Sequence, residues 1–276
     1  MYYKQRFNKA EVLRWSQFSR HGDAIFLTLK REVLVGVLSV ATLTAACPDS
    51  SAARMSTASS SPHAADEDSL QASALEDSSP NDISCLETGD LLFNVVSPTR
   101  DGVAAAIVDV TEGYDLQRVS HVAIVCIEAD GTIFALEASS AHGVWLNPID
   151  SFLVHSDHSP QGLPLVLVGR LKDQSSAAAS VSKAKAYIGR PYDHQYLPGD
   201  SALYCSELVH YSYTTSDGTP IFPQQPMSFH DKSGQVTPFW VNYYRRWNME
   251  VPEGWPGTNP GALSKSHAID IIGRFF

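Results

Sequence analysis

The sequence predicts an α+β fold, in which helices pack on a small antiparallel β-sheet or barrel. The clearest evidence is the stretch from residue 121 to residue 138, where two β-rich runs flank Asp130-Gly131, a dipeptide typical of hairpin turns. A further β-rich run lies at 163–171, and helical patterns follow at 173–189 and from Cys205 onward. Strands that gather in the middle of a chain and are followed by helices favour an antiparallel sheet.

The expected elements can be given in chain order. They are a turn and short strand in "GDLLF" (89–93), a helix opened by Asp101 and stopped by Gly113, the hairpin strands 121–128 and 132–138, a strand in 163–171, a helix in 173–189, and a helix from Cys205.

The helix expected at 173–189 illustrates the reasoning. Asp173 is a good N-cap residue, and Gly189 is a typical stop because glycine adopts the left-handed conformation that ends many helices. Val181, Ala184 and Ile188 have the spacing of one helix face. We therefore expect these three side chains to lie on one face of the helix.

The chain of 276 residues divides by composition into three parts. Residues 1–47 have the character of an export leader, because the apolar run Val33–Ala46 follows two basic residues and ends in small ones. Residues 48–82 are rich in Ser, Ala, Asp and Glu, which predicts a disordered tether. Residues 83–276 form the predicted folded domain. A buried core helix is the alternative interpretation of the apolar run.

The end of the leader leaves two kinds of processing open. The run closes with "LTAAC", which is similar to the lipobox of bacterial lipoproteins and would make Cys47 the lipidated residue. Thr44 stands where leucine is usual, so simple cleavage near Ala46 is an equal alternative. The whole leader resembles the extended leaders of some exported and outer-membrane receptor proteins of Gram-negative bacteria. We therefore expect a periplasmic protein or a lipoprotein anchored to the outer membrane.

Charge excludes some partners. The formal net charge is −10, which argues against nucleic acid and against an anionic membrane surface. No apolar run reaches the roughly 20 residues that a transmembrane helix needs. A lipid on Cys47 is therefore the expected route to a membrane.

Cys205 is the first candidate for chemistry. It lies after "PGDS", in the first turn of the predicted helix, where the helix dipole favours the thiolate form of a cysteine. A buried structural cysteine and a disulfide are the alternatives. If Cys47 carries a lipid, then Cys85, Cys126 and Cys205 remain, so at least one thiol is unpaired.

The residues around Cys205 resemble known enzymes. "GRPYD" followed by "YCSELV" is similar to the motif of NlpC-type cell-wall cysteine peptidases, although Tyr204 stands where that family has Asp and Glu207 where it has Gly. In that family the histidine follows the cysteine, whereas here "SHVAIV" with His121 precedes it. "GDLLF", "HVAIV", "EA", "GRPYD" and "YCSELV" occur in this order, which is the pattern of the circularly permuted papain-like YiiX/YaeF-like branch. The tail "VPEGWPGTNPGALSKS" also resembles members of this branch.

This resemblance implies a permuted papain-like fold and a cysteine hydrolase that cleaves amides through a thioester acyl-enzyme. Cys205 would be the nucleophile, His121 the base and Glu137 the group that orients His121. Glu137 shares a sheet face with His121 only if the hairpin has a three-residue loop with Gly131 in the left-handed region, so that residue 137 pairs with 123. A two-residue loop would pair 137 with 124, and Asp193 would then be the first alternative to Glu137.

Other polar residues receive lesser roles. Tyr192 and Asp193 are expected to shape the loop beside the nucleophile, and the Cys205 backbone N–H is expected to be one oxyanion donor. "HSDH" at 155–158 has no second pair of ligands at zinc-type spacing, so no metal and no cofactor are predicted.

The expected substrate is a peptide or acyl amide, with peptidoglycan fragments as one possibility. A non-catalytic binding module and a lipid amide or acyl hydrolase on the same scaffold are the alternatives. A lecithin:retinol-type acyltransferase carries "NCEHF" around its cysteine, and "YCSELV" does not match it.

Overall fold

The computed structural model describes residues 83–276. The expected leader (1–47), with Cys47, and the expected tether (48–82) lie outside the described residues. Within the described part, no helix has the length and apolar character needed to cross a membrane.

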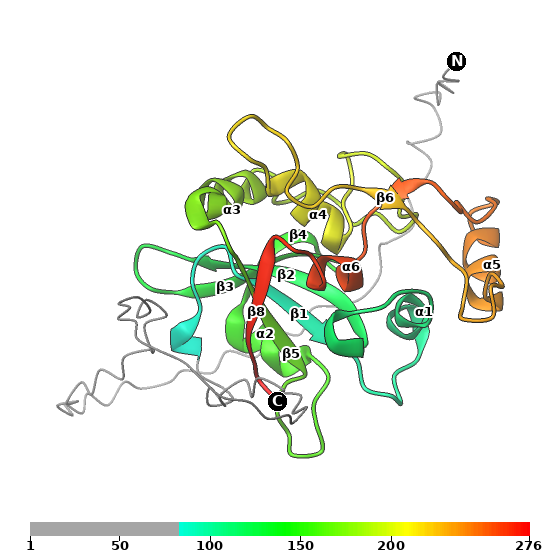
Figure 1. Ribbon diagram of the computed structural model, residues 1–276, viewed down its shortest axis with the longest axis horizontal. Coiled ribbons are helices and arrows are strands. Elements are labelled where there is room, and N and C mark those ends of the chain that lie inside the picture. The colour runs from blue at the N-terminus through cyan, green and yellow to red at the C-terminus, as the bar shows by residue number, and fades with distance from the viewer. Residues whose placement is uncertain (1–82) are drawn as a thin grey trace, which may run out of the picture. The chain divides into compact units, whose positions relative to one another are not determined.

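A six-stranded antiparallel sheet forms the centre of this domain (Figure 1). The strand order is β4-β3-β2-β1-β5-β8, so the first four strands of the chain are neighbours in reverse order, and the C-terminal strand adds to the opposite edge. The strands are β1 (Leu91–Val95), β2 (Val119–Ile127), β3 (Ile133–Ser139), β4 (Gly143–Pro148), β5 (Val166–Leu171) and β8 (Ile269–Arg274). A separate two-stranded ribbon joins β6 (Gln225–Pro226) to β7 (Pro256–Gly257).

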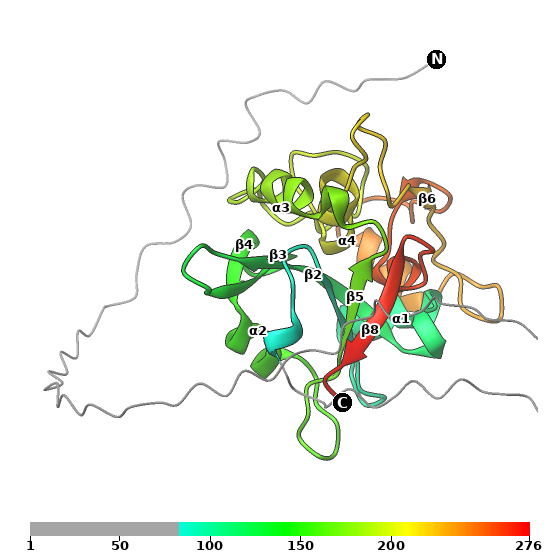
Figure 2. The ribbon, with the colours of Figure 1, turned by 60° about the vertical axis from the view of Figure 1, so that its left-hand side comes forward.

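Helices cover both faces of the sheet, as Figures 1 and 2 show for α3 and α4 on one side and α2 on the other. The helices are α1 (Gly102–Val110), α2 (Ile149–His155), α3 (Ala177–Lys185), α4 (Cys205–Ser212), α5 (Pro238–Arg245) and α6 (Pro260–Ser264). Alternate residues of the strands enter two different cores. Leu91, Phe93 and Ile124 pack with α3, α4 and α6, whereas Leu92 and Val125 pack with α2. The α+β class with an antiparallel sheet is therefore confirmed.

The β2–β3 hairpin has the register that the assignment of Glu137 requires. Ile124 pairs with Leu136, so the same register places residue 137 opposite residue 123. The loop contains three residues, and its last residue, Gly131, has φ +86°, where a residue with a Cβ is strained. The Gly131 N–H donates to the Glu128 carbonyl over 2.9 Å. The prediction of a three-residue loop is confirmed.

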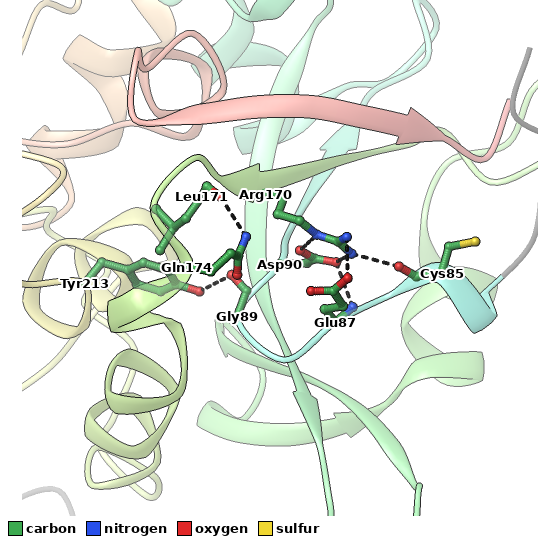
Figure 3. Close-up of polar contacts among 8 residues, drawn as sticks. All are labelled: Cys85, Glu87, Gly89, Asp90, Arg170, Leu171, Gln174 and Tyr213. Atoms are coloured by element: carbon green, nitrogen blue, oxygen red, sulfur yellow. Dashed lines mark hydrogen bonds and ion pairs between the residues drawn. The ribbon is translucent and has the colours of Figure 1, made fainter. Parts of the chain in front are cut away.

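Gly89 and Asp90, the "GD" of "GDLLF", form hydrogen bonds that hold the start of β1 in place (Figure 3). Asp90 is 1% exposed and accepts two hydrogen bonds from Arg170 of β5, at 2.8 Å and 2.7 Å. Arg170 also donates to Glu87 and to the main-chain oxygen of Cys85. The Gly89 carbonyl accepts from the buried Tyr213 hydroxyl, which follows α4. The motif therefore joins the sheet to the end of the helix that begins at Cys205.

The helix expected at 173–189 forms in a shorter version. Asp173 accepts from the Ser175 N–H over 3.0 Å at the start of a 3-10 turn, and α3 follows. Val181 and Ala184 are buried. Ile188 is 44% exposed and does not continue the helix face of Val181 and Ala184, because α3 ends at Lys185 and turns follow.

Candidate active site

Cys205 is the first residue of α4, as the sequence predicts. Tyr204 before it is extended, so the chain enters the helix directly at the cysteine. The cysteine is 5% exposed, and it lines a hollow on the surface of the domain. Cys126 and Cys205 are the free cysteines among the described residues. They differ in surroundings, because Cys126 is 0% exposed and burial raises the pKa of its thiol.

His121 lies on β2 beside a β-bulge. It pairs with Asn94 of β1, whereas the next pair is Val95 with Val119, so Ser120 is the extra residue. A bulge turns side chains away from the regular alternation, and bulges often lie next to active sites. The pairing of β2 with β3 ends at Ile124, and His121 lies three residues before Ile124 in the sequence. The ring therefore lies where the two strands separate.

Glu137 of β3 holds one nitrogen of this ring. Its Oε2 lies 2.5 Å from Nε2 of His121, and its Oε1 accepts from Nδ2 of Asn147 over 2.9 Å. Glu137 is 6% exposed, so these two contacts replace water around the carboxylate. Since Nε2 is taken, Nδ1 is the nitrogen left for a thiol.

The charges in this cluster support each other. Burial lowers the pKa of His121, but interaction with Cys205, and then with Glu137, outweighs it and raises the pKa to about 10. Burial raises the pKa of Glu137, but the hydrogen bond and the charge of His121 outweigh it, so this pKa lies below its usual range. The structure thus brings the three residues predicted from sequence into one electrostatic cluster, with His121 between the other two.

The "RPYD" loop is fixed by its own backbone and by α5. The Asp193 carboxylate accepts from the N–H groups of Gln195 (2.8 Å) and Leu197 (2.7 Å). The Tyr243 hydroxyl donates to the carbonyl of His194 over 2.8 Å. Asp193 is therefore occupied within its loop, which agrees with the structural role expected for it. Tyr192 of this loop lines the hollow that contains Cys205.

Cys205 and His121 line two different hollows that share part of their walls. One is lined by Cys205 and by aromatic and aliphatic side chains of α1, α5 and the loop that contains Tyr192 and Tyr196. The other is lined by His121 and Glu137, together with polar, charged and apolar residues. Ile107, Tyr192 and Tyr196 line both. Cys205 and His121 thus face different chemical surroundings.

Comparison with known proteins places this arrangement in a family. The family model described as permuted papain-like amidase enzyme, YaeF/YiiX, C92 family, matches residues 85–273. This range covers most of the chain. The chain belongs to the permuted papain-like amidase family. Membership explains why the histidine precedes the cysteine in this member, and it makes the chain a cysteine hydrolase of the amidase type in general terms.

Two relatives from Escherichia coli resemble this member of the family. The uncharacterized protein YiiX of strain K12 is 26% identical over 188 residues, which are 68% of this chain and 86% of that protein. The crystal structure titled metalloprotein yiiX from strain O157:H7 has 21% sequence identity, a TM-score of 0.54, and covers 68% of this chain and 97% of that chain. This second likeness shows the fold. Within residues 83–276 of this permuted papain-like amidase, no three His, Cys, Asp or Glu side chains gather in a way that would hold a metal.

Sequence reasoning missed two residues of this site. Asn147, which binds Glu137, lies on β4, a strand that the sequence analysis did not predict. Glu207 was noted only as a departure from the NlpC-type motif, yet it is completely buried in the first turn of α4. Burial, and then the charge of Asp193, raise the pKa of Glu207 to about 9, so its carboxyl group is neutral at pH 7.

Proposed function

We propose that this protein is a cysteine amidase in which Cys205, His121 and Glu137 act as nucleophile, base and orienting carboxylate. The observation that carries the proposal is the pair of contacts at His121: Glu137 holds Nε2, and the interaction with Cys205 raises the pKa of the ring. A thiolate–imidazolium pair oriented by a third group is what a cysteine hydrolase needs.

The chemistry follows in two steps. The Cys205 sulfur attacks the amide carbon, and the Cys205 backbone N–H at the start of α4 is positioned to stabilise the oxyanion. As the C–N bond breaks, His121 gives its proton to the leaving amine, and the acyl group remains on sulfur as a thioester. Water then attacks the thioester while His121 takes a proton from it. The C–S bond breaks and a carboxylic acid leaves.

The test uses p-nitrophenyl acetate, an activated acyl donor, on the full chain. We expect an acetyl adduct on Cys205, located by mass spectrometry of peptides, that forms rapidly and then hydrolyses. Cys205→Ala should abolish the adduct. Cys126→Ala is the matched control, since it removes the other free cysteine of the described region and should leave the adduct unchanged. An adduct that persists in Cys205→Ala, or a Cys205 that acylates no faster than a free thiol, would refute the proposal.

We also propose that the chain is exported to the periplasm or, through a lipid on Cys47, to the outer membrane. The support is the basic residues, apolar run and "LTAAC" of the leader. Labelling cells with a radioactive fatty acid should mark the wild-type chain but not Cys47→Ser. An unlabelled chain that is found in the periplasm would support simple cleavage, and a chain that stays in the cytoplasm would refute export.

A further inference from the structure

We propose that Asn147 is a positioning residue of this site: its side-chain N–H holds the Glu137 carboxylate, so that the proton between Glu137 and His121 stays on the imidazole. The inference rests on the proposed amidase function and adds to it a residue that acts on the histidine through the carboxylate. Its importance lies in the charge of the ring, because a neutral imidazole would leave the Cys205 thiolate without a cation beside it.

Asn147, Glu137 and His121 form a diagonal row across three neighbouring strands. Ala135 of β3 pairs with Asn147 of β4, and Glu137 is two residues further along β3, so Asn147 and Glu137 are diagonal neighbours on one sheet face. His121 is the diagonal neighbour of Glu137 on β2, by the register of the hairpin. The residue after Asn147 is Pro148, the N-cap of α2. The position of the amide is therefore set by a paired strand and by the start of a helix.

The two oxygens of the Glu137 carboxylate have different donors. Oε2 lies 2.5 Å from Nε2 of His121, and Oε1 accepts from Nδ2 of Asn147 over 2.9 Å. Glu137 and Asn147 are each 6% exposed, so bulk water has little access to this contact. Asn147 therefore supplies the hydrogen bond that solvent would give to an exposed carboxylate.

This hydrogen bond favours the charged form of Glu137. Burial raises the pKa of Glu137, but His121 and then the N–H groups of Asn147 and Trp145 lower it below its usual range. A donor on Oε1 stabilises the ionised carboxylate more than the neutral acid. Because His121 and Glu137 are in direct contact, anything that stabilises the carboxylate favours imidazolium and carboxylate over two neutral groups. The amide of Asn147 thus acts on the ring that it does not touch.

The orientation of the Asn147 amide supports this role. With Nδ2 turned toward Glu137, Oδ1 is buried and has no hydrogen-bond partner among residues 83–276. The opposite orientation would set Oδ1 against Oε1 of Glu137, and two acceptors repel each other. An unpaired buried oxygen costs stability, and an apolar side chain would fill the same space without that cost. The donor is therefore the feature of Asn147 that the site uses.

Other titratable groups surround this row. Burial lowers the pKa of His121, whereas Cys205 and then Glu137 raise it. The hollow that contains Glu137 is also lined by three tyrosines and by Arg100, Asp101, His155, Asp157 and His194. These groups remain in place in every variant described below, so they do not produce a difference between variants.

The main test is Asn147→Leu in the full chain, which keeps a branched side chain and removes the donor. The readout is the ¹⁵N NMR spectrum of the imidazoles at pH 7, with the His121 signals identified by their loss in His121→Gln. Both ring nitrogens of His121 should be protonated in the wild type, in which its pKa is about 10. The neutral ring should replace this form in Asn147→Leu, whereas a merely structural asparagine would leave the signals unchanged.

The reactivity of Cys205 gives a second readout. In Asn147→Leu the acid limb of its alkylation by iodoacetamide should move to higher pH by about one unit, because the thiolate loses its cation. The kcat/KM for p-nitrophenyl acetate at pH 7 should fall about tenfold. Val144→Ala is the matched control, since Val144 is buried in the same strand but packs in the core on the other sheet face. It should destabilise the fold and leave spectrum and limb unchanged.

The outcomes separate this inference from the proposed function. An imidazolium at His121 in Asn147→Leu, with an unmoved acid limb, would overturn the inference, and so would a neutral His121 in the wild type, which needs no variant. If Asn147→Leu does not fold, Asn147→Ala provides the same comparison. If the wild type forms no acetyl adduct on Cys205 but the spectrum changes as expected, the amidase function fails and the role of Asn147 stands. If the adduct forms and the ring stays charged in the variant, the role of Asn147 fails and the amidase function stands.

Discussion

Glu137→Gln is the most informative single change, because the structure predicts which hydrogen bonds the glutamine side chain will form. Glu137 accepts from both His121 and Asn147, and glutamine has one oxygen for these two donors. Oδ1 of Asn147 is buried and has no hydrogen-bond partner within the described region. If Asn147 rotates its amide, it can accept from the new NH₂ group, and the glutamine oxygen can stay on Nε2 of His121. The ring would then keep the tautomer that leaves Nδ1 for the thiol.

Glu137→Gln is therefore expected to remove the negative charge beside His121 but to leave the orientation of the ring unchanged. A hydrogen bond to a charged group contributes about 1–2 kcal/mol more than a neutral one, which corresponds to about a 5- to 30-fold reduction in kcat/KM. If the glutamine instead turned its NH₂ group toward His121, the ring would be held in the wrong tautomer, and losses of about 10⁴ are known for that situation.

The pH profile gives an independent measure of the same contact. His121 has a pKa of about 10, raised first by Cys205 and then by Glu137. Removing the carboxylate charge should move the alkaline limb of kcat/KM to lower pH by about one unit. The limb should not move all the way to an ordinary imidazole value, because the interaction with Cys205 remains.

The assay is the hydrolysis of p-nitrophenyl acetate, followed across pH in the wild type, Glu137→Gln and Glu128→Gln. Glu128 lies at the other end of β2 and binds Lys185 over 2.8 Å, so its replacement should change neither rate nor profile. If Glu137→Gln loses about 10⁴, then adding Asn147→Asp should restore activity, since a carboxylate would draw the NH₂ group toward itself. A loss below about twofold with an unmoved alkaline limb would refute the role of Glu137.

Three further predictions concern the fold. Asp90→Asn should lower the free energy of unfolding, measured in urea, by about 3 kcal/mol, because it leaves the guanidinium of Arg170 without its bidentate partner. The control is Lys172→Met, which removes the exposed ion pair with Asp270 and should change the free energy of unfolding by less than about 1 kcal/mol. Gly131→Ala should cost about 1 kcal/mol in the same measurement, since φ is +86° there, and no loss would mean that the turn relaxes. Glu207 has a pKa of about 9 in the folded chain against 4.5 unfolded, so its contribution is fully present below about pH 4.5 and is lost as pH rises toward 9. Glu207→Gln should therefore remove a fall in stability of about 1 kcal/mol per pH unit between pH 5 and 8, and an unchanged slope would show that Glu207 is ionised in the fold.

The sequence was informative where local chemistry decides the structure. The hairpin itself follows from Asp130-Gly131, because glycine can adopt positive φ, whereas its register was inferred from the assignment of Glu137. The start of α4 at Cys205 follows from the turn residues before it. The sequence was uninformative where distant segments decide. β4 and β8 are edge strands whose pairing depends on the assembled sheet, so "GVWLNP" and "IDIIGR" carry little signal of their own. Asn147 was missed for that reason, because its role depends on the pairing of β4 with β3.

Asp90 and Glu207 show why a motif alone does not reveal what its acidic residue does. Both belong to motifs that carried the family resemblance, and both are almost inaccessible to water, at 1% and 0% exposure. Burial makes a carboxylate costly unless a cation or hydrogen-bond donors compensate it. Asp90 meets the guanidinium of Arg170 on the neighbouring strand and so fastens β1 to β5. Glu207 is buried near the charge of Asp193 and forms no ion pair within residues 83–276, and its carboxyl group therefore keeps its proton at neutral pH. The three buried acidic residues therefore differ in the partner that the fold gives them. Glu137 contacts His121, and for this reason we propose a catalytic role for Glu137 and not for the other two.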